Sequence, residues 1–433
     1  MTDNLNILGK AQNLLPFMTS IRRQIHENPE LGMEEYDTAE LIGEQLDHIG
    51  ISYKTGVGKT GIAGLIEGKA GKGKCIGLRA DMDALPLTDQ KDVSYASKKP
   101  GIMHACGHDS HVAMLLGAAR ILNDLKEEFS GSVKLVFQPA EECIGGALPM
   151  IKDGVMENPS VDSMIGLHID SSTKSGVVML LKGPCHAAQN DFEIIVTGRG
   201  GHAAVPHKSV DTILIASKIV VELHHIVSRH IDPLEPAVLT VGIIEGGTKS
   251  NIIPDRVFLK GTIRYLNDTV GEDLRYWLEK IAKATAEMSG GECSVRFIPG
   301  YIVGINDETL TDKVWNYLED FLPEGYLHRE KHPIMGSEDF SYFANKVPSV
   351  FMGLGGRGEG ENTAYPHHHP KFDFDEKAMA HGAAALARVA VEFLNEQEKL
   401  YKTMSEASKD PLFMKDLDDS MRDTSKGLSK IPE

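Results

Sequence analysis

The sequence predicts an α/β protein in which a mostly parallel β-sheet is covered by helices and carries a second, inserted unit. Short apolar runs alternate with helical patterns in the first half of the chain and again near its C-terminal end, as is typical of parallel sheets. Between these regions the order changes to strand, helix, strand, strand, helix, strand. The 433 residues exceed the roughly 250–300 at which one hydrophobic core stops growing, so we expect two domains.

Most of the predicted sheet comes from the first half of the chain. The elements expected there are helices near residues 11–28, 35–49 and 108–126 and strands at 75–79, 133–138 and 164–168. The same pattern continues late in the chain with a helix near 308–321, a strand at 349–354 and a long helix over about 375–401. Strands that alternate with helices imply a sheet with both faces covered.

The middle segment interrupts this pattern. Its expected elements are strands at 192–197, 238–245, 257–265 and 293–298 and helices near 209–229 and 271–288. The β-α-β-β-α-β order is that of a ferredoxin-like unit. We therefore predict a main domain in two parts, a domain inserted between them and an exposed polar tail, with these boundaries: 1–187 and 300–401, 188–299, and 402–433.

Composition and charge exclude several classes of function. The net charge is −17 and the chain has no block rich in lysine and arginine, so we expect no nucleic-acid or anionic-membrane partner. The first ten residues do not resemble a signal peptide, and no apolar run approaches the roughly 20 residues of a membrane span. The five cysteines are scattered, which fits a reducing compartment. We expect a cytoplasmic protein.

Potential metal ligands follow three of the predicted strands. Asp81 and Asp83 follow the strand at 75–79, Glu141 and Glu142 follow the strand at 133–138, and His168 ends the strand at 164–168. In open α/β sheets the carboxyl ends of the strands form the binding crevice, so these side chains are expected to converge. His168 alone could equally be a core histidine that donates to a backbone carbonyl.

The densest cluster of potential ligands lies at the start of the predicted helix near 108. Residues 103–111 read MHACGHDSH and hold a thiol, three imidazoles and a carboxylate. A metal ion and a helix N-terminus both stabilise a thiolate, and Gly107 would let the backbone fold tightly around an ion. Each residue alone could be a helix cap, a buried thiol or a surface histidine. Together they favour a metal site.

Two further patterns complete the candidate chemistry. Two-metal hydrolysis needs one carboxylate on the ion and another that takes a proton from water, so we interpret Glu142 as a ligand and Glu141 as the general base. In the run at 367–369, which is internal and precedes the last helix, one histidine is expected to be a ligand.

The inserted segment also holds candidate binding residues. A glycine-rich bend at 198–204 carries His202, which could be part of a simple turn. Asn251 and Arg264 lie on or beside neighbouring strands, and a cationic or amide group there could bind a substrate carboxylate. The pattern alone does not decide between structural and binding roles for these three residues.

The chain resembles the M20 metallopeptidase family, and within it the amidohydrolase branch of aminoacylase-like, hippurate hydrolase-like and indole-acetyl-amino acid hydrolase-like enzymes. The resemblance runs in order over about nine-tenths of the chain, and only the tail falls outside it. The stretches that carry it are LRADMDALP at 78–86, MHACGHDSH at 103–111, FQPAEE at 137–142, GLH at 166–168, GRGGHAAVPH at 198–207, SNIIPD at 250–255, GTIRY at 261–265, GSEDFS at 336–341 and HHPKFDFDE at 368–376.

The resemblance implies a two-metal, exopeptidase-like catalytic domain with an inserted lid or dimerisation domain, in a homodimer or homotetramer. It implies two divalent ions per subunit, zinc or manganese, with cobalt or nickel as alternatives. The implied ligands are Cys106, His108, Glu142, His168 and His368, with His369 as the alternative to His368. Relative to the wider family, Arg79 stands where other branches have a metal-binding histidine, and Cys106 replaces a bridging carboxylate.

The resemblance also assigns roles beyond metal binding. Glu141 would be the base, His202 would polarise the scissile carbonyl in the partner subunit's site, and Asn251 and Arg264 would bind the substrate. The expected reaction is hydrolysis of the amide bond of N-acyl amino acids, which releases a carboxylic acid and a free amino acid. A metallo-carboxypeptidase or dipeptidase acting on short peptides is the alternative. A catalytically silent binding protein is disfavoured because every residue of the chemical set is present.

Overall fold

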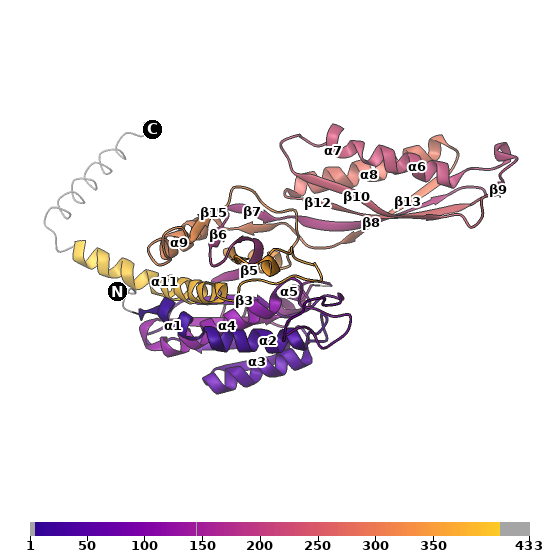
Figure 1. The fold of residues 1–433 in the computed structure, drawn as a ribbon. Helices are drawn as coiled ribbons and strands as arrows, with labels where there is room; N and C mark the ends of the chain where they lie inside the picture. The colour runs from indigo at the N-terminus through magenta and orange to yellow at the C-terminus, as the bar shows by residue number, and fades with distance from the viewer. Residues whose placement is uncertain (1–4, 144, 408–433) are drawn as a thin grey trace, which may run out of the picture.

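The protein consists of a large α/β unit and a smaller unit that projects from it (Figure 1). The structure is a computed structural model, and it describes residues 5–143 and 145–407. The large unit is built on an eight-stranded sheet in the order β1-β2-β4-β3-β5-β16-β6-β15. The strands are β1 (Ser52–Val57), β2 (Gly61–Glu67), β3 (Cys75–Asp81), β4 (Ser132–Gln138), β5 (Ser163–Lys174), β6 (Val178–Leu180), β15 (Leu327–Arg329) and β16 (Ser349–Arg357).

The centre of this sheet is parallel, which confirms the predicted fold class. Strands β4, β3, β5 and β16 are consecutive parallel neighbours, and every residue of β3 and β4 is buried. The predicted pattern omitted β1 and β2, which join the sheet as an antiparallel edge next to β4. The short strands β6 and β15 extend the other edge.

Helices cover both faces of the sheet because the side chains of each strand alternate between two cores. Leu135 and Phe137 of β4 pack in one core with helices α2, α4 and α11, whereas Val136 packs in the other with α5 and α10. The helices of this unit are α1 (Ile7–Asn13), α2 (Leu15–Glu27), α3 (Tyr36–Ile49), α4 (His108–Asp124), α5 (Ala147–Lys152), α9 (Glu308–Glu319), α10 (Ser341–Ala344) and α11 (Ala378–Ala407).

Two predicted helices differ from the observed ones for local reasons. The single helix expected near 11–28 is divided into α1 and α2, and α2 begins with a proline in its first turn, where the missing N–H is tolerated. The last helix begins at Ala378 and continues to Ala407. Its end therefore falls inside the predicted polar tail, and the remainder of that tail, 408–433, lies outside the described residues.

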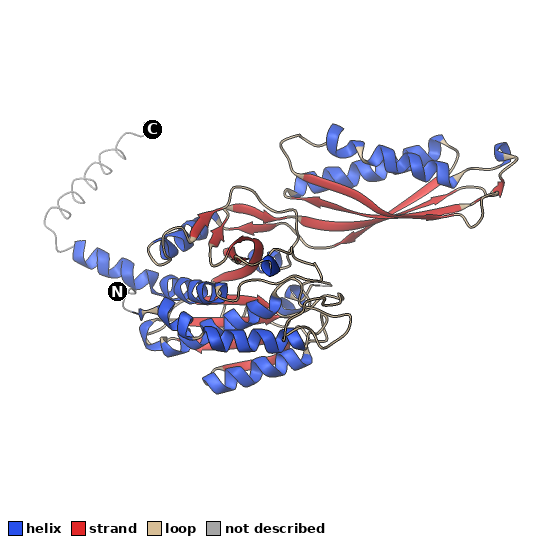
Figure 2. Ribbon diagram, viewed as in Figure 1, coloured by secondary structure: helices blue, strands red, loops and turns tan. Residues whose placement is uncertain are grey.

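The smaller unit has its own antiparallel sheet in the order β10-β12-β8-β13. Figure 2 shows its helices on one face of this sheet, and its hydrophobic core is separate from the other two. Strand β8 alternates buried and half-exposed residues, as expected for a sheet covered on one face. The elements are β8 (Ala188–Thr197), α6 (Thr212–Leu223), α7 (His225–Arg229), β10 (Ala237–Gly246), β12 (Arg256–Tyr265), α8 (Asp268–Met288) and β13 (Glu292–Pro299).

Short two-stranded pairings occur at both ends of the smaller unit. Strands β7 (Gly183–His186) and β14 (Gly304–Asn306) pair where the chain leaves and re-enters the large unit, and β9 (Gly201–His202) pairs with β11 (Ile252–Ile253) at the far end (Figure 1). The domain boundaries and the lid or dimerisation role stay predictions. No helix in the described part of the chain combines the length and apolarity that a membrane crossing requires.

The separate core of the smaller unit leads to a stability prediction. Leu278 of α8 is fully buried in that core, so Leu278→Ala should lower the free energy of unfolding of this unit by about 2–5 kcal/mol. The two tryptophans of the sequence lie one in each unit, Trp277 in α8 and Trp315 in α9. Urea unfolding of a Trp315→Phe background, followed by fluorescence, therefore measures the smaller unit alone.

The matched control is Met288→Ala, because Met288 ends the same helix and is 77% exposed. It should change the free energy of unfolding by less than about 0.5 kcal/mol. Equal destabilisation by the two substitutions would contradict the packing described for α8.

Candidate functional site

The candidate site lies where the carboxyl ends of the central parallel strands meet the start of helix α4. Strand β3 ends at Asp81, which is paired in register with Gln138 at the end of β4, and residues 139–142 follow directly. His168 is on the neighbouring strand β5, which continues beyond the predicted end to Lys174. The structure therefore brings together the strand ends that the sequence pattern indicated, as expected for an open α/β sheet.

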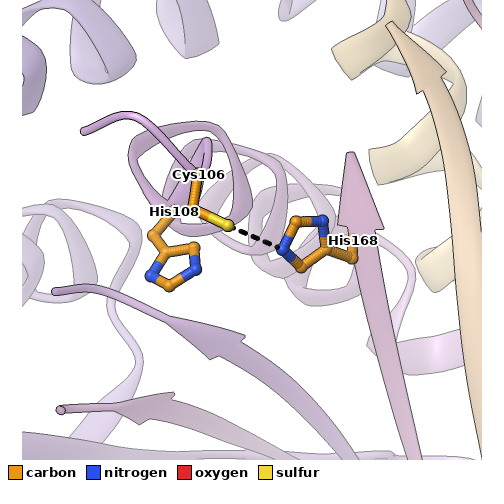
Figure 3. A group of neighbouring side chains, drawn as sticks. All are labelled: Cys106, His108 and His168. Carbon is orange, nitrogen blue, oxygen red and sulfur yellow. Dashed lines mark hydrogen bonds between the residues drawn. The ribbon is translucent and has the colours of Figure 1, made fainter. Parts of the chain in front are cut away.

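The five predicted ligands form two groups that share one thiol. Cys106, His108 and His168 make up one group, and Cys106, Glu142 and His368 make up the other; within each group the potential ligand atoms lie within 4.8 Å of one another. Figure 3 shows His108 and His168 on either side of Cys106, whose Sγ is 3.4 Å from Nε2 of His168. A thiolate shared in this way could bridge two ions.

In each imidazole of the first group Nδ1 is held by an oxygen acceptor, so Nε2 is the nitrogen available to a metal. Nδ1 of His168 donates to the carbonyl oxygen of Ile169 (2.6 Å), which directs Nε2 to Cys106. Nδ1 of His108 donates to Asp83 (3.2 Å), while its buried Nε2 has no hydrogen-bond partner among the described residues. Metal-binding histidines are usually held by such a bond from the other ring nitrogen. The residues present therefore fit a metal ion.

Gly107 makes the close approach of these ligands sterically allowed. Its φ is 93°, in the left-handed region, and a Cβ added to it would lie 2.4 Å from Cγ2 of Ile169. A side chain here would clash as well as strain the backbone. Helix α4 begins at the next residue, His108, so the partly positive helix N-terminus lies next to Cys106 and favours the thiolate.

The two glutamates lie on a turn that is held from several directions. Ala140, just before them, has a φ of 56° although it is not glycine. The backbone N–H of Glu142 donates to Asp83 (2.9 Å), and the hydroxyl of Tyr301 donates to the carbonyl oxygen of Glu141. Asp83 thus contacts both His108 and the backbone of Glu142. The sequence pattern singled out Asp83 but did not indicate Tyr301, which lies 160 residues away.

The histidine run presents three different environments. His368 has its Nε2 3.2 Å from Oε1 of Glu142 and a φ of 62°. His369 stacks on Tyr365, and its Nδ1 accepts the N–H of Lys371. Nε2 of His367 accepts the N–H of Ser171. Of the three, His368 is the one in a candidate metal group.

Arg79 forms ion pairs with three buried carboxylates close to the two glutamates. Its buried guanidinium pairs with Asp81 (2.6 Å), Glu338 (2.8 Å) and Asp339 (3.1 Å). Arg79 therefore supplies an internal cation to these carboxylates. Glu141, Glu338 and Asp339 also form a candidate metal group. Because Arg79 already neutralises Glu338 and Asp339, this group is less suited to a metal ion than the two groups that share Cys106.

His111 of the MHACGHDSH stretch is also occupied by internal hydrogen bonds. Its Nδ1 is bonded to Asp81, and its Nε2 accepts the N–H of Ile169 (2.9 Å). Both ring nitrogens are therefore used, and the group of Asp81, His108 and His111 is less suited to an ion than the two groups that share Cys106. His104 is buried and belongs to no candidate metal group of the described residues.

The site holds several buried acidic groups whose negative charge a metal ion would offset. Burial, together with Glu338 and Asp339, raises the pKa of Glu141 well above its usual range, and burial with Glu142 nearby does the same to the pKa of the Cys106 thiol. Burial lowers the pKa of His168 well below its usual range, so this ring is neutral. Nearby cations favour thiolates and carboxylates, so they would stabilise the deprotonated forms that act as ligands.

Four of the five predicted ligands line a pocket of about 1320 Å³ together with Glu141, and the pocket also includes part of the smaller unit; these ligands are Cys106, Glu142, His168 and His368. Arg264 of β12 reaches this pocket, and its Nη1 donates to the carbonyl oxygen of Met335 (3.1 Å) and to the hydroxyl of Ser337 (3.2 Å). Gln189, at the start of β8, also lines it. A cation that lines the same pocket as the metal ligands could bind a carboxylate.

The structure does not bring His202 and Asn251 to this pocket. Both are exposed: His202 is in β9, and Asn251 directly precedes β11, which pairs with β9. Figure 1 shows β9 at the end of the smaller unit farthest from β3 and β5. The N–H of Ala203 donates to the carbonyl oxygen of Asn251 (3.1 Å). Nδ1 of His202 accepts the N–H of Ala204 (3.0 Å), so the neutral ring carries its proton on Nε2 and can donate it to another group.

Comparisons with known proteins agree with this site and fold. A family model described as peptidase family M20/M25/M40 matches residues 77–392. Thermostable carboxypeptidase 2 of Saccharolobus solfataricus is 43% identical over 88% of this chain and 96% of its own length. IAA-amino acid hydrolase ILR1-like 4 of Arabidopsis thaliana is 40% identical over 90% of this chain and 88% of its own.

A solved structure of an M20 family protein has a similar fold. It is the YXEP protein of Bacillus subtilis, described as a dinuclear metal-binding peptidase of the M20 family. Its TM-score is 0.77 at 30% identity, and the match covers 88% of this chain and 99% of that one.

The steric role of Gly107 leads to a prediction. Gly107→Ala should weaken the affinity for zinc or manganese by at least about tenfold, because the new Cβ displaces the ligands on both sides of it. Metal titration against a chromophoric chelator measures this affinity. Gly101→Ala is the matched control, because Gly101 has a similar φ of 82° but no atom within 4 Å of the added Cβ. Equal losses in the two variants would rule out a specific role for Gly107.

Proposed function

The chain belongs to peptidase family M20/M25/M40 and is a metal-dependent hydrolase, and on that premise we propose that it hydrolyses the amide bond of N-acyl amino acids. The products would be a carboxylic acid and a free amino acid. The observation that carries this proposal is that one pocket is lined by Glu141, Arg264 and members of both ligand groups, namely Cys106, Glu142, His168 and His368. The pocket thus offers metal ligands, a candidate base and a carboxylate partner for one small substrate.

We propose two divalent ions per subunit, zinc or manganese, with cobalt or nickel as alternatives. A set that mixes thiolate and imidazole suits zinc, and the additional carboxylate is also a good ligand for manganese. The two groups described above support this set: Cys106, His108, Glu142, His168 and His368. When bound, the ions would acidify a water molecule and polarise the scissile carbonyl.

Glu141 is the proposed general base. It is buried, lines the pocket and follows the strained turn next to the ligand Glu142. In this role its carboxylate accepts a proton from the attacking water and then transfers that proton to the leaving nitrogen. Its elevated pKa fits the second half of this cycle, because the group must hold a proton before releasing it.

Arg264, Asn251 and His202 are the proposed substrate-contacting residues outside the metal groups. Arg264 would bind the α-carboxylate of the amino acid, and the free Nε2–H of His202 would donate to the scissile carbonyl. Because His202 and Asn251 lie far from their own pocket, we propose that they act in the partner's pocket within a homodimer or homotetramer. This assembly and the cytoplasmic location expected from the sequence stay predictions.

A carboxypeptidase or dipeptidase is the alternative, and it has a specific observation in its favour. Thermostable carboxypeptidase 2 is 43% identical to this chain, and a peptide with a free C-terminus would use the same carboxylate partner. The two substrate classes differ on the other side of the scissile bond, where a dipeptide carries a free ammonium group and an N-acyl amino acid does not. A buried ammonium needs an anionic partner, and the pocket lining includes the carboxylates of Asp170, Glu330 and Glu338.

A substrate panel tests the proposed function. N-acetylmethionine and hippurate should be hydrolysed with a kcat/KM at least about tenfold higher than Gly-Met, a difference of ~1.4 kcal/mol. A chelator should abolish this activity, and added zinc, manganese or cobalt should restore it. Preference for the dipeptide would favour the alternative. Inertness with every metal and every substrate would support a binding protein.

Substitution of the proposed base gives a second prediction. Glu141→Gln should lower kcat by roughly 10²–10⁴-fold while the metal content stays at the wild-type value, because the amide cannot accept the proton. Kinetics and elemental analysis on the same sample measure both quantities. Glu142→Gln is the control, and it should lose metal as well as activity. Near-normal turnover in Glu141→Gln would contradict the assignment of the base.

Mixed dimers extend this test to His202. If Glu141 acts within its own subunit and His202 in the partner's, a heterodimer of Glu141→Gln and His202→Ala subunits has one site with both residues intact. Such heterodimers, purified with two different tags, should recover about half of the wild-type activity although each homodimer is nearly inactive. No recovery would place both residues in the same site.

A further inference from the structure

The turn that carries Glu141 and Glu142 is held by a carboxylate from a distant part of the chain. The backbone N–H of Ala140 donates to Oε1 of Glu35 (2.9 Å), a residue 105 positions away in the sequence. Ala140 is fully buried and adopts a φ of 56°, a conformation that residues with a Cβ adopt only when their surroundings impose it. The bond from Glu35 is a contact that can impose it.

Glu35 contributes little else to the local structure. It occupies the N-cap position of α3, yet its side chain makes no capping hydrogen bond. Glu30 performs that function, because its carboxylate accepts the N–H groups of Asp37 (3.1 Å) and Thr38 (2.8 Å). The other oxygen of Glu35 accepts the hydroxyl of Thr60 (2.5 Å). Within the described residues this fully buried carboxylate forms no ion pair, so its observed bonds are to Thr60 and Ala140.

Each residue from Ala140 to Glu142 thus has a backbone group bonded to a side chain from a distant part of the chain. Glu35 accepts from residue 140, Tyr301 donates to the carbonyl oxygen of residue 141, and Asp83 accepts from residue 142. Hydrogen bonds to buried backbone groups are strong restraints because an unpaired buried group is costly. The side chains of Glu141 and Glu142 leave the turn in directions that depend on these three bonds.

We propose that Glu35 is a positioning residue for the metal-binding and catalytic glutamates, acting through the conformation of Ala140. This inference rests on the proposed metal site. Loss of the Glu35 carboxylate would let Ala140 relax from its left-handed conformation, which rotates the following peptides and moves Glu142 away from Cys106 and His368. Glu35 contacts neither metal nor substrate in this account.

Metal affinity, measured with zinc alone, tests the proposal without reference to any substrate. Glu35→Met keeps the length of the side chain but removes the acceptor, and it should weaken zinc binding roughly 10–100-fold, as substitutions of residues that orient ligands do. Glu35→Gln retains an oxygen that can accept from Ala140 and should bind zinc within about threefold of wild type. Glu30→Met is the matched control: it should lower the thermal midpoint and leave zinc affinity unchanged.

A second substitution at residue 140 distinguishes positioning from general stability. Glycine adopts a positive φ without steric cost, so Ala140→Gly in the Glu35→Met background should restore most of the zinc affinity. If Glu35→Met does not fold, Glu35→Asp replaces it, because its shorter side chain withdraws the carboxylate from Ala140 while keeping the charge. The same loss and the same rescue are expected.

Three outcomes would overturn the proposal: wild-type zinc affinity in the Glu35 variant, an equal loss in Glu30→Met, or no rescue by Ala140→Gly. Failure of the proposed function has a different signature. In that case N-acyl amino acids are not hydrolysed by the wild-type protein, while the zinc affinities still follow the order expected for Glu35.

Discussion

An excess of buried acidic groups around one thiol is the constraint on which the rest of the site depends. Glu141, Glu338 and Asp339 are buried together and face the single guanidinium of Arg79, while Cys106 and Glu142 lie directly beside them. Carboxylates and thiols packed at this density retain protons unless cations are present. Arg79 offsets the charge of Glu338 and Asp339. Divalent ions in the two ligand groups would offset the charge of Cys106 and Glu142.

Residues that contact neither metal nor substrate fix the positions of the ligands in this site. Asp83 holds both the ring of His108 and the backbone of Glu142, so two ligands from separate segments are fixed by one carboxylate. Ala140 and His368 adopt a positive φ within the site although neither is glycine. Such strain persists only where surrounding contacts determine the backbone, and here it accompanies the approach of Glu142 and His368 to Cys106.

The sequence was informative where chemistry is concentrated locally and uninformative where it depends on long-range contacts. The parallel centre of the sheet and the grouping of Cys106, His108 and Glu142 could be predicted, because alternating apolar runs and a dense cluster of ligands are local patterns. The antiparallel edge of β1 and β2 was missed. Arg79 was not recognised as a charge partner because it lies within an apolar run, 259 residues from Glu338. Glu35 was missed because the backbone group that it binds, the N–H of Ala140, lies 105 residues away.

Two divalent ions held by the proposed ligand groups would share the thiolate of Cys106. Anomalous diffraction from crystals of the wild-type protein grown with manganese or zinc measures this directly. If the two ligand groups each hold an ion, two anomalous peaks per subunit are expected near Sγ of Cys106, one close to His108 and His168 and the other close to Glu142 and His368. A single peak, or peaks that do not share the thiol, would contradict this arrangement.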